Sequence, residues 1–305
     1  MWKASPEQVV AARARIDPVF LDMPLRRSPA LDRRVGAQLL LKDETANPIR
    51  SFKGRGASNF MALLAPTRGL VCASAGNFGQ GLAWAARKHG VPLTVFASTA
   101  AVASKVAAMR TLGATVILEG RDFDAAKQAA AAYAQREGLR YVEDGAVAEI
   151  AEGAGTLALE ISEAGETFES IICPLGNGAL AAGVGCWAKA LPVPAEVVAV
   201  SAKGAPAMAL SVIGNRIVST DHAETIADGI AVRVPIASAV EAVRRVVDDV
   251  VLVEDETIVE AMAILHDHFG LTVEPAGATG LAAILSQPGR WQGKTVAIPL
   301  CGGNV

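Results

Sequence analysis

A lysine, Lys53, stands where a loop opens a predicted helix, in the run NPIRSFKGRG over residues 47–56. The helix macrodipole disfavours an ammonium group at a helix N-terminus, so this position favours a neutral amine. A neutral amine is the form that attacks a carbonyl carbon and makes a Schiff base. Lys53 is therefore a candidate catalytic residue, and the competing interpretation is a solvated lysine at the surface.

Two turns of small residues also open predicted helices. They are Ser74-Ala75-Gly76-Asn77-Phe78 and Gly176-Asn177-Gly178-Ala179-Leu180. Backbone N–H groups at a helix start bind carboxylates and phosphates, and small side chains let a ligand approach the backbone. The second turn also fits the dinucleotide fingerprint GxGxxA, but the acidic residue expected about 20 residues later is absent near Lys203. A nicotinamide-dependent oxidoreductase is the alternative that this turn leaves open.

A cysteine, Cys301, ends an apolar run and is followed by Gly302-Gly303-Asn304. A buried cysteine is commonly a packing residue. In open α/β sheets, however, ligands bind outside the carboxyl ends of the strands. We therefore expect one site to contain Lys53, both turns and Cys301.

The elements that must position these residues follow an α/β pattern. Short runs rich in Val, Ile and Leu alternate with longer Ala-rich segments of helical period, which is typical of a parallel sheet with crossover helices. The predicted strands are 38–42, 69–73, 93–97, 115–118, 170–174, 197–201, 250–253 and 295–299. The predicted helices are 54–64, 78–89, 101–112, 123–137, 147–164, 179–191, 258–269 and 276–285, with one more beginning near Ser5.

The order of these elements indicates two domains. Three strand-helix units crowd into residues 68–146, whereas the strands before and after this stretch need each other to complete a sheet. We predict a small domain over residues 68–146, inserted into a large domain made of residues 1–67 plus 147–305. No repeat or low-complexity linker divides the chain.

Composition limits the classes of function. The chain has 305 residues, of which 51% are apolar, and a net charge of −3. This composition predicts a compact protein, and the net charge predicts no basic surface of the kind that binds nucleic acids or anionic membranes. No apolar stretch reaches the roughly 18 to 20 residues of a membrane span and the N-terminus lacks a signal peptide's apolar core, so we expect a cytoplasmic protein. The Cys and His residues are not spaced like metal ligands, so we expect no metal site.

In their order and intervals, the motifs resemble those of the serine/threonine dehydratases, pyridoxal-phosphate enzymes of fold type II, the fold of the tryptophan synthase β-subunit. The motifs are SFKGRGA at 51–57, SAGN at 74–77, GNGA at 176–179, TIADGIAV at 225–232, EPAGA at 274–278 and CGGN at 301–304. The similarity runs from about residue 16 to the end. It implies pyridoxal 5'-phosphate as cofactor, two open and mostly parallel twisted sheets flanked by helices, a cofactor site between the large and small domains, and a homodimer.

The resemblance also implies a role for each site residue. Lys53 would form the Schiff base with the cofactor and Phe52 would pack near its ring. The cofactor-binding residues are Phe52, Lys53, Asn77, Gly176, Asn177, Gly178, Ala179, Leu180 and Cys301, with Asn77 at the ring hydroxyl, the turn at the phosphate and Cys301 at the pyridine nitrogen. The substrate-binding residues are Ser74, Ala75, Gly76, Asn77, Phe78 and Gly229. Glu274 and Asp228 follow the family motifs, but a charged residue at a helix start is more often a cap than a catalyst.

The implied reaction is β-elimination from a 3-hydroxy amino acid such as L-threonine or L-serine, giving a 2-oxo acid and ammonia. A thiol cannot keep the pyridine nitrogen protonated, and the weaker electron sink that results favours prompt loss of a β-leaving group. The alternatives are a β-replacement synthase, a dehydratase of hydroxyaspartate or phenylserine, and a sensor that binds the amino acid without turnover.

Three departures from the family refine these expectations. Ala75 stands where related serine racemases carry a serine that acts as acid and base on the opposite face, so we expect weak racemisation. The segment 201–207 lacks the acidic residues with which some relatives bind a divalent cation. The chain ends at the Cys301 motif, so we expect no regulatory domain for feedback by isoleucine.

Overall fold

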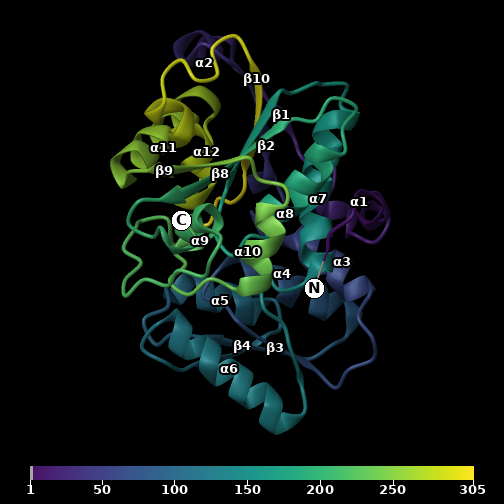
Figure 1. Ribbon diagram of the computed structural model, residues 1–305. Coiled ribbons are helices and arrows are strands. Elements are labelled where there is room, and N and C mark those ends of the chain that lie inside the picture. Colours follow the sequence, from purple (N-terminus) through teal and green to yellow (C-terminus); the bar gives the residue numbers. More distant parts are fainter. Residues whose placement is uncertain (1–2) are drawn as a thin grey trace.

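The computed structural model describes residues 3–305 and has the predicted α/β architecture. Two mostly parallel sheets lie in two parts of the molecule, the larger in the upper half of Figure 1 and the smaller in the lower half. Helices flank both sheets. The predicted fold class, with its two sheets, is confirmed.

The larger sheet has six strands in the order β1-β2-β10-β7-β8-β9. Their bounds are β1 Leu25–Arg26, β2 Gln38–Asp43, β7 Ser170–Pro174, β8 Glu196–Ala202, β9 Asp249–Val253 and β10 Thr295–Leu300. β1 is antiparallel to β2, and the other neighbours are parallel. The central register pairs Ala297 of β10 with Leu40 of β2 and with Ile171 of β7. The strands β2, β10, β7, β8 and β9 therefore all have their carboxyl ends at the same edge of the sheet.

Alternating side chains bury both faces of this sheet. Leu39 and Leu41 belong to a core with α11 (Asp255–Phe269) and α12 (Pro275–Ser286), whereas Leu40 belongs to a core with α7 (Ala148–Glu163) and α8 (Ala179–Lys189). Parallel sheets need this double cover because their strands are apolar on both sides. On the face covered by α7 and α8, α10 (Ala237–Arg244) packs against α8 and α9 (Ala207–Gly214).

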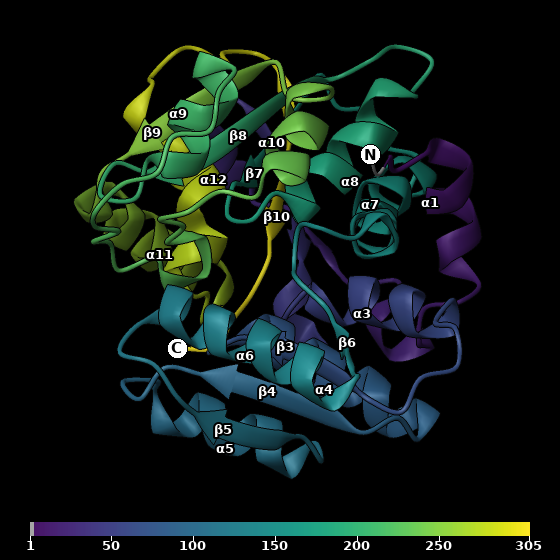
Figure 2. The same ribbon diagram turned by 60° about the horizontal axis from the view of Figure 1, so that its bottom comes forward.

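The smaller sheet has four parallel strands in the order β5-β4-β3-β6. They are β3 Leu70–Ala73, β4 Leu93–Ala97, β5 Thr115–Leu118 and β6 Arg140–Tyr141. One face packs on α3 (Lys53–Ala62), α4 (Asn77–His89) and α5 (Ala103–Thr111), and the other on α6 (Phe123–Glu137). Figure 2 shows this sheet below the larger one, with the C-terminal end of the chain between them.

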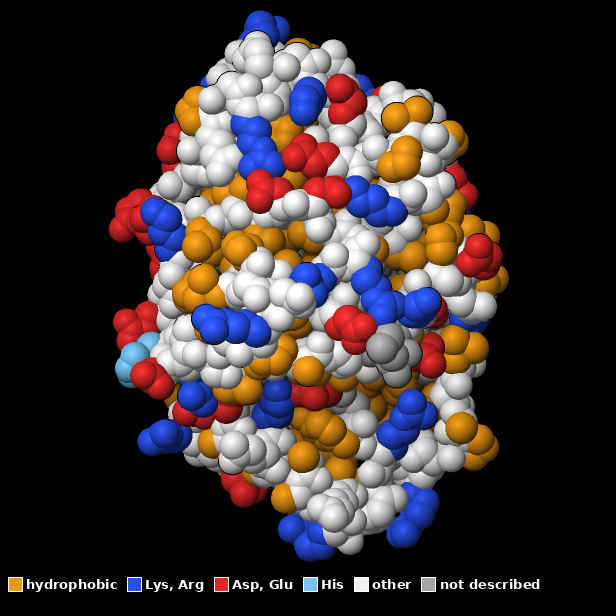
Figure 3. Space-filling view, viewed as in Figure 1, with side chains coloured by type: hydrophobic (Ala, Val, Ile, Leu, Met, Phe, Trp, Pro, Cys, Tyr) orange, Lys and Arg blue, Asp and Glu red, His pale blue; other side chains and the backbone are white. Residues whose placement is uncertain are grey.

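Shorter elements complete the chain. α1 (Pro6–Arg13) begins at a Ser5 cap and packs on α7, and α2 (Pro29–Val35) begins at a Ser28 cap. Three 3-10 turns cover Pro18–Phe20, Glu44–Ala46 and Asp228–Ile230. On the face drawn in Figure 3, Lys and Arg side chains alternate with Asp and Glu. Within residues 3–305, no helix is both long enough and apolar enough to cross a bilayer.

The predicted strands are all present, with ends shifted by at most one residue, and the predicted helices differ by at most three residues at an end. Sequence reasoning missed β1, β6, α2, α9 and α10. The two strands are only two residues long, and α9 is so apolar that its pattern has no helical period. The domain boundaries, 1–67 plus 147–305 and 68–146, stay a prediction, although the smaller sheet falls within residues 70–141.

Candidate active site

A cavity of about 530 Å³ lies among the carboxyl ends of the strands and is lined by segments of both sheets. It brings together every site residue expected from the sequence: Phe52, Lys53, Ser74, Ala75, Gly76, Asn77, Phe78, Gly176, Asn177, Gly178, Ala179, Leu180, Gly229 and Cys301. Asp228 and Glu274 line it as well. Residues separated by as many as 249 positions, from Phe52 to Cys301, thus meet in one place.

Lys53 is the first residue of α3, one position earlier than predicted, and the loop before it is fixed by backbone contacts. The N–H of Phe52 donates to the carbonyl oxygen of Cys301 at 3.1 Å, and Ser51 forms an isolated bridge with Gly302. The start of α3 is therefore held against the end of β10. This contact explains why two motifs at opposite ends of the sequence form one site.

The amine of Lys53 has a carboxylate partner that sequence reasoning missed. Its Nζ lies 2.5 Å from Oδ2 of Asp144 and 4.7 Å from the ring centre of Phe52. Both charged side chains are largely buried, with exposed fractions of 15% for Lys53 and 12% for Asp144. The amine therefore has a carboxylate within hydrogen-bond distance, and its neutral form stays a prediction. Asp144 follows a two-residue strand, and no local pattern marks its distance from Lys53.

The turn at residues 74–78 leaves open N–H groups at the start of α4. The Ser74 hydroxyl oxygen accepts hydrogen bonds from the N–H groups of Gly76, at 3.2 Å, and Gly79, at 2.9 Å. No side chain caps α4 at Gly76. The N–H groups of Asn77 and Phe78 are in the first turn, where a helix supplies no acceptors. This end of the cavity is suited to a carboxylate.

Asn77 connects this turn to a buried acid. Its side-chain nitrogen donates to both carboxylate oxygens of Glu274, at 2.7 and 3.0 Å, and its oxygen accepts from Asn304 at 2.8 Å. Burial raises the pKa of Glu274 to about 7, against the lowering effect of the hydrogen bond from Asn77. The nearby charge of Asp228 also raises this pKa. Glu274 thus changes its charge near neutral pH inside the site.

The turn at residues 176–180 opens α8 in a similar way. Gly178 precedes the helix with φ of 90°, a conformation that favours glycine, and no side chain caps the helix. The N–H groups of Ala179 and Leu180 therefore lack acceptors within the helix. Gly176 lies close to Gly229, since an added Cβ at Gly176 would be 2.9 Å from the Gly229 oxygen. The turn is a candidate phosphate site.

The comparisons with known proteins decide the family. A model of the family described as pyridoxal-phosphate dependent enzyme matches residues 16–302. L-threonine ammonia-lyase of Thermotoga maritima is 36% identical over 302 residues, or 98% of this chain and 75% of that protein. The chain belongs to the serine/threonine dehydratase family of pyridoxal-phosphate-dependent enzymes. This membership removes the dinucleotide-binding alternative.

Solved structures of the family are similar over the whole chain. Maize serine racemase has a TM-score of 0.93 and 31% identity, and the match covers 100% of this chain and 94% of that one. The T.th. threonine deaminase has a TM-score of 0.92 and 31% identity, with 99% and 98% covered. Both have fold type II, which is therefore the fold of this dehydratase-like enzyme.

The residues of the cavity fit the cofactor of the family, pyridoxal phosphate. An amine, Lys53, faces the cavity, and the uncapped start of α8 offers N–H groups to a phosphate. A buried thiol, Cys301, lines the same space. Burial raises the pKa of this thiol well above its usual range, and the charge of Glu274 adds to the effect, so Cys301 is uncharged.

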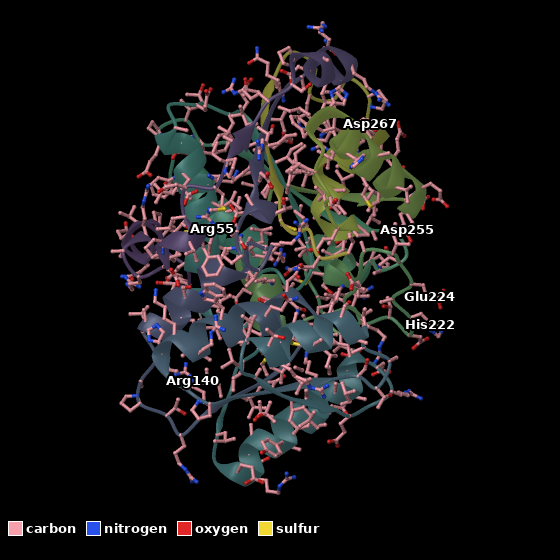
Figure 4. All side chains as sticks on the ribbon, turned by 180° about the vertical axis from the view of Figure 1, so that it is seen from behind. Arg55, Arg140, His222, Glu224, Asp255 and Asp267 are labelled. Carbon is pink, nitrogen blue, oxygen red and sulfur yellow. The ribbon has the colours of Figure 1, made fainter. Side chains whose placement is uncertain are left out.

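Ion pairs connect the two sides of the cavity mouth. Lys105 of α5 pairs with Asp228, and Arg233 pairs with Asp124 of α6 at 2.7 Å. Sequence reasoning missed Lys105, Arg233 and Asp124, because ion pairs between residues far apart in the sequence follow no spacing rule. His222 and Glu224 also line the mouth, but their side chains point to solvent at the edge of the molecule in Figure 4. Within residues 3–305, no cluster of three His, Cys, Asp or Glu side chains is placed to hold a metal ion.

Proposed function

We propose that this enzyme is an ammonia-lyase that removes water from a 3-hydroxy amino acid, such as L-serine or L-threonine, and yields a 2-oxo acid and ammonia. The observation that carries the proposal is the convergence, in one cavity, of Lys53 with two helix starts whose first N–H groups have no side-chain cap. An amine base, a carboxylate site and a phosphate site are what the reaction needs in one place.

Each predicted residue takes a role in this proposal. The α8 turn (Gly176, Asn177, Gly178, Ala179 and Leu180) would hold the cofactor phosphate, Lys53 would hold the cofactor covalently, and Phe52, Asn77 and Cys301 would contact its ring. The α4 turn (Ser74, Ala75, Gly76, Asn77 and Phe78), together with Gly229, would bind the amino acid through its carboxylate. Both anionic groups of the ligands would then lie at positive helix ends.

When bound, pyridoxal phosphate supplies the electron sink that makes the α-proton of the substrate removable. Lys53 removes that proton, because its amine lies in the cavity 5.8 Å from the ring centre of Phe78 in the α4 turn, whereas the other cavity lysine, Lys105, is paired with Asp228. The α4 turn fixes the substrate carboxylate and so orients the α-carbon toward Lys53. The neutral thiol of Cys301 provides no positive or negative charge to the ring, which favours elimination over long-lived carbanion chemistry.

Ala75 favours a lyase over a racemase. Racemisation needs a second acid or base on the face of the substrate opposite Lys53. The family resemblance puts Ala75 on that face, where it offers only a methyl group, and the hydroxyl of neighbouring Ser74 is hydrogen-bonded to the backbone at Gly76 and Gly79. This matters because a serine racemase is among the similar structures.

The test is release of 2-oxo acid, with pyridoxal phosphate supplied, from L-serine, L-threonine, the two 3-hydroxyaspartates and 3-phenylserine. Oxo acid from L-serine or L-threonine is the expected result, and Lys53→Ala is the control that should abolish it. Product from hydroxyaspartate or phenylserine alone would reassign the substrate. Product that requires an added nucleophile would replace the lyase with a β-replacement synthase.

The proposal includes a homodimer in the cytoplasm, supported by the family resemblance. Light scattering after gel filtration tests the oligomeric state. A monomer with full activity would contradict the dimer without affecting the proposed reaction.

A further inference from the structure

Asp144 is a cavity residue to which the proposed function gives no role. Its Oδ2 lies 2.5 Å from Nζ of Lys53, and its side chain is only 12% exposed. Its other oxygen, Oδ1, is buried and has no hydrogen-bond partner among residues 3–305. A buried carboxylate oxygen without a partner is costly and calls for an explanation.

The loop that carries Asp144 is held firmly against the phosphate turn. Gly145 has φ of 88°, and an added Cβ there would be only 2.1 Å from the carbonyl oxygen of Asn177. The backbone next to Asp144 thus packs directly on the α8 turn. Asp144 is therefore positioned between Lys53 and that turn rather than on a free loop.

Three other acids of the cavity already have side-chain partners. Asp228 pairs with Lys105, Asp124 pairs with Arg233, and Glu274 accepts from Asn77. Asp144 combines a free oxygen with direct contact to the proposed base. Since the α- and β-carbons of an amino acid are bonded to each other, a group in contact with Nζ is also near the β-substituent.

We propose that Asp144 is the acid that protonates the leaving hydroxyl group, and this inference rests on the proposed ammonia-lyase function. Lys53 takes the proton from the α-carbon, and the C–H electron pair becomes part of the new Cα–Cβ double bond. Lys53 passes the proton to Oδ2 of Asp144. Asp144 gives a proton to the β-oxygen as the Cβ–O bond breaks, so that water leaves and both residues return to their starting forms without any oxidation.

The test compares two leaving groups in the variant Asp144→Asn. L-serine needs a proton on its departing hydroxyl, whereas β-chloro-L-alanine loses chloride without one. We expect kcat with L-serine to fall at least about 100-fold, and kcat with β-chloro-L-alanine to change less than about threefold. Unchanged turnover of L-serine, or equal losses with both substrates, would overturn the proposal.

A matched control and a binding measurement separate this role from a structural one. Asp228→Asn removes a different cavity acid and should change the two rates by the same factor. The dissociation constant of pyridoxal phosphate, measured by fluorescence quenching, should differ little between Asp144→Asn and the wild type. A large loss of cofactor affinity in Asp144→Asn would make its role structural and contradict the proposal.

Measurements on the wild type separate an error in the proposed ammonia-lyase function from an error in the role of Asp144. If it releases no 2-oxo acid from β-chloro-L-alanine or from any of the five 3-hydroxy amino acids named above, the ammonia-lyase function itself is wrong. If it turns over both substrates and Asp144→Asn shows no difference between them, only the role of Asp144 is wrong.

Discussion

Glu274 is a carboxyl group whose charge is set by its surroundings. Its side chain is buried, and Asn77 is bonded to both of its oxygens. Burial raises its pKa from 4.5 to about 7. Glu274 therefore binds its proton more tightly in the folded protein than in the unfolded chain. The resulting stabilisation of the fold is complete below pH 4.5, and it is lost as the pH rises through about 7.

The variant Glu274→Gln should remove this pH dependence. The difference between 4.5 and about 7 corresponds to about 3 kcal/mol. Glutamine keeps an acceptor for Asn77 but never ionises, so the variant should gain stability relative to the wild type between about pH 5 and pH 8. Urea unfolding across this range measures the effect. A stability difference that does not vary with pH would show that Glu274 does not titrate there.

Ala75→Ser tests the proposal that Ala75 makes this enzyme a lyase rather than a racemase. A hydroxyl at this position would supply the missing acid and base opposite Lys53, so racemisation of L-serine should rise at least about tenfold. Chiral chromatography of the remaining serine measures it. Ala75→Gly is the control, since it changes the size of the side chain without adding a proton donor. Equal racemisation by all three proteins would refute this explanation.

At the scale of elements, the starts of three helices and the end of one strand build the site. Lys53 begins α3, Asn77 begins α4, and Ala179 begins α8, while Cys301 follows β10 directly. The sequence motifs predicted these junctions because a change from an apolar strand to a small-residue turn is a local signal. The missed Asp144 depends instead on the pairing of β6 with β3, a long-range contact with no local pattern.

Gly178→Ala should weaken cofactor binding through the backbone. Gly178 has φ of 90°, and an added Cβ would be 2.8 Å from a methyl carbon of Val243. Alanine there costs about 1–2 kcal/mol and shifts the N–H groups of the α8 turn. The dissociation constant of pyridoxal phosphate and the unfolding free energy should both worsen.

Gly138→Ala is the matched control for this prediction. Gly138 also has a left-handed backbone, with φ of 64°, but it ends α6 and has open space around it. The Gly138→Ala variant should lose stability but bind pyridoxal phosphate with the affinity of the wild type. Equal affinities in the two variants would contradict the assignment of the α8 turn to the phosphate.

At the scale of the whole molecule, a buried charge network joins α3, the carrier of Lys53, to the larger sheet. Arg55, labelled in Figure 4, is fully buried and is hydrogen-bonded to Glu44 at 2.8 Å and to Glu160 of α7 at 2.6 Å. Lys42 of β2 also reaches Glu160, at 2.6 Å. Sequence reasoning did not predict this network, because charged residues are ordinarily expected at the surface.

Arg55→Met should be strongly destabilising. It leaves the carboxylates of Glu44 and Glu160 buried with fewer partners, at a cost of about 3–5 kcal/mol. Arg136→Met is the control, because Arg136 and its partner Glu137 are exposed and such pairs contribute about 0–1 kcal/mol. Denaturant unfolding compares the two. Similar losses in both variants would show that the buried network does not stabilise the fold.

The central claim, that Lys53 holds pyridoxal phosphate in this cavity, has one direct measurement. Borohydride reduction of the loaded protein fixes the cofactor on its lysine, and peptide mass spectrometry then identifies that residue. Two lysines line the cavity, Lys53 and Lys105. We predict the modification on Lys53. Modification of Lys105, or of a lysine outside the cavity, would contradict the assignment of the site.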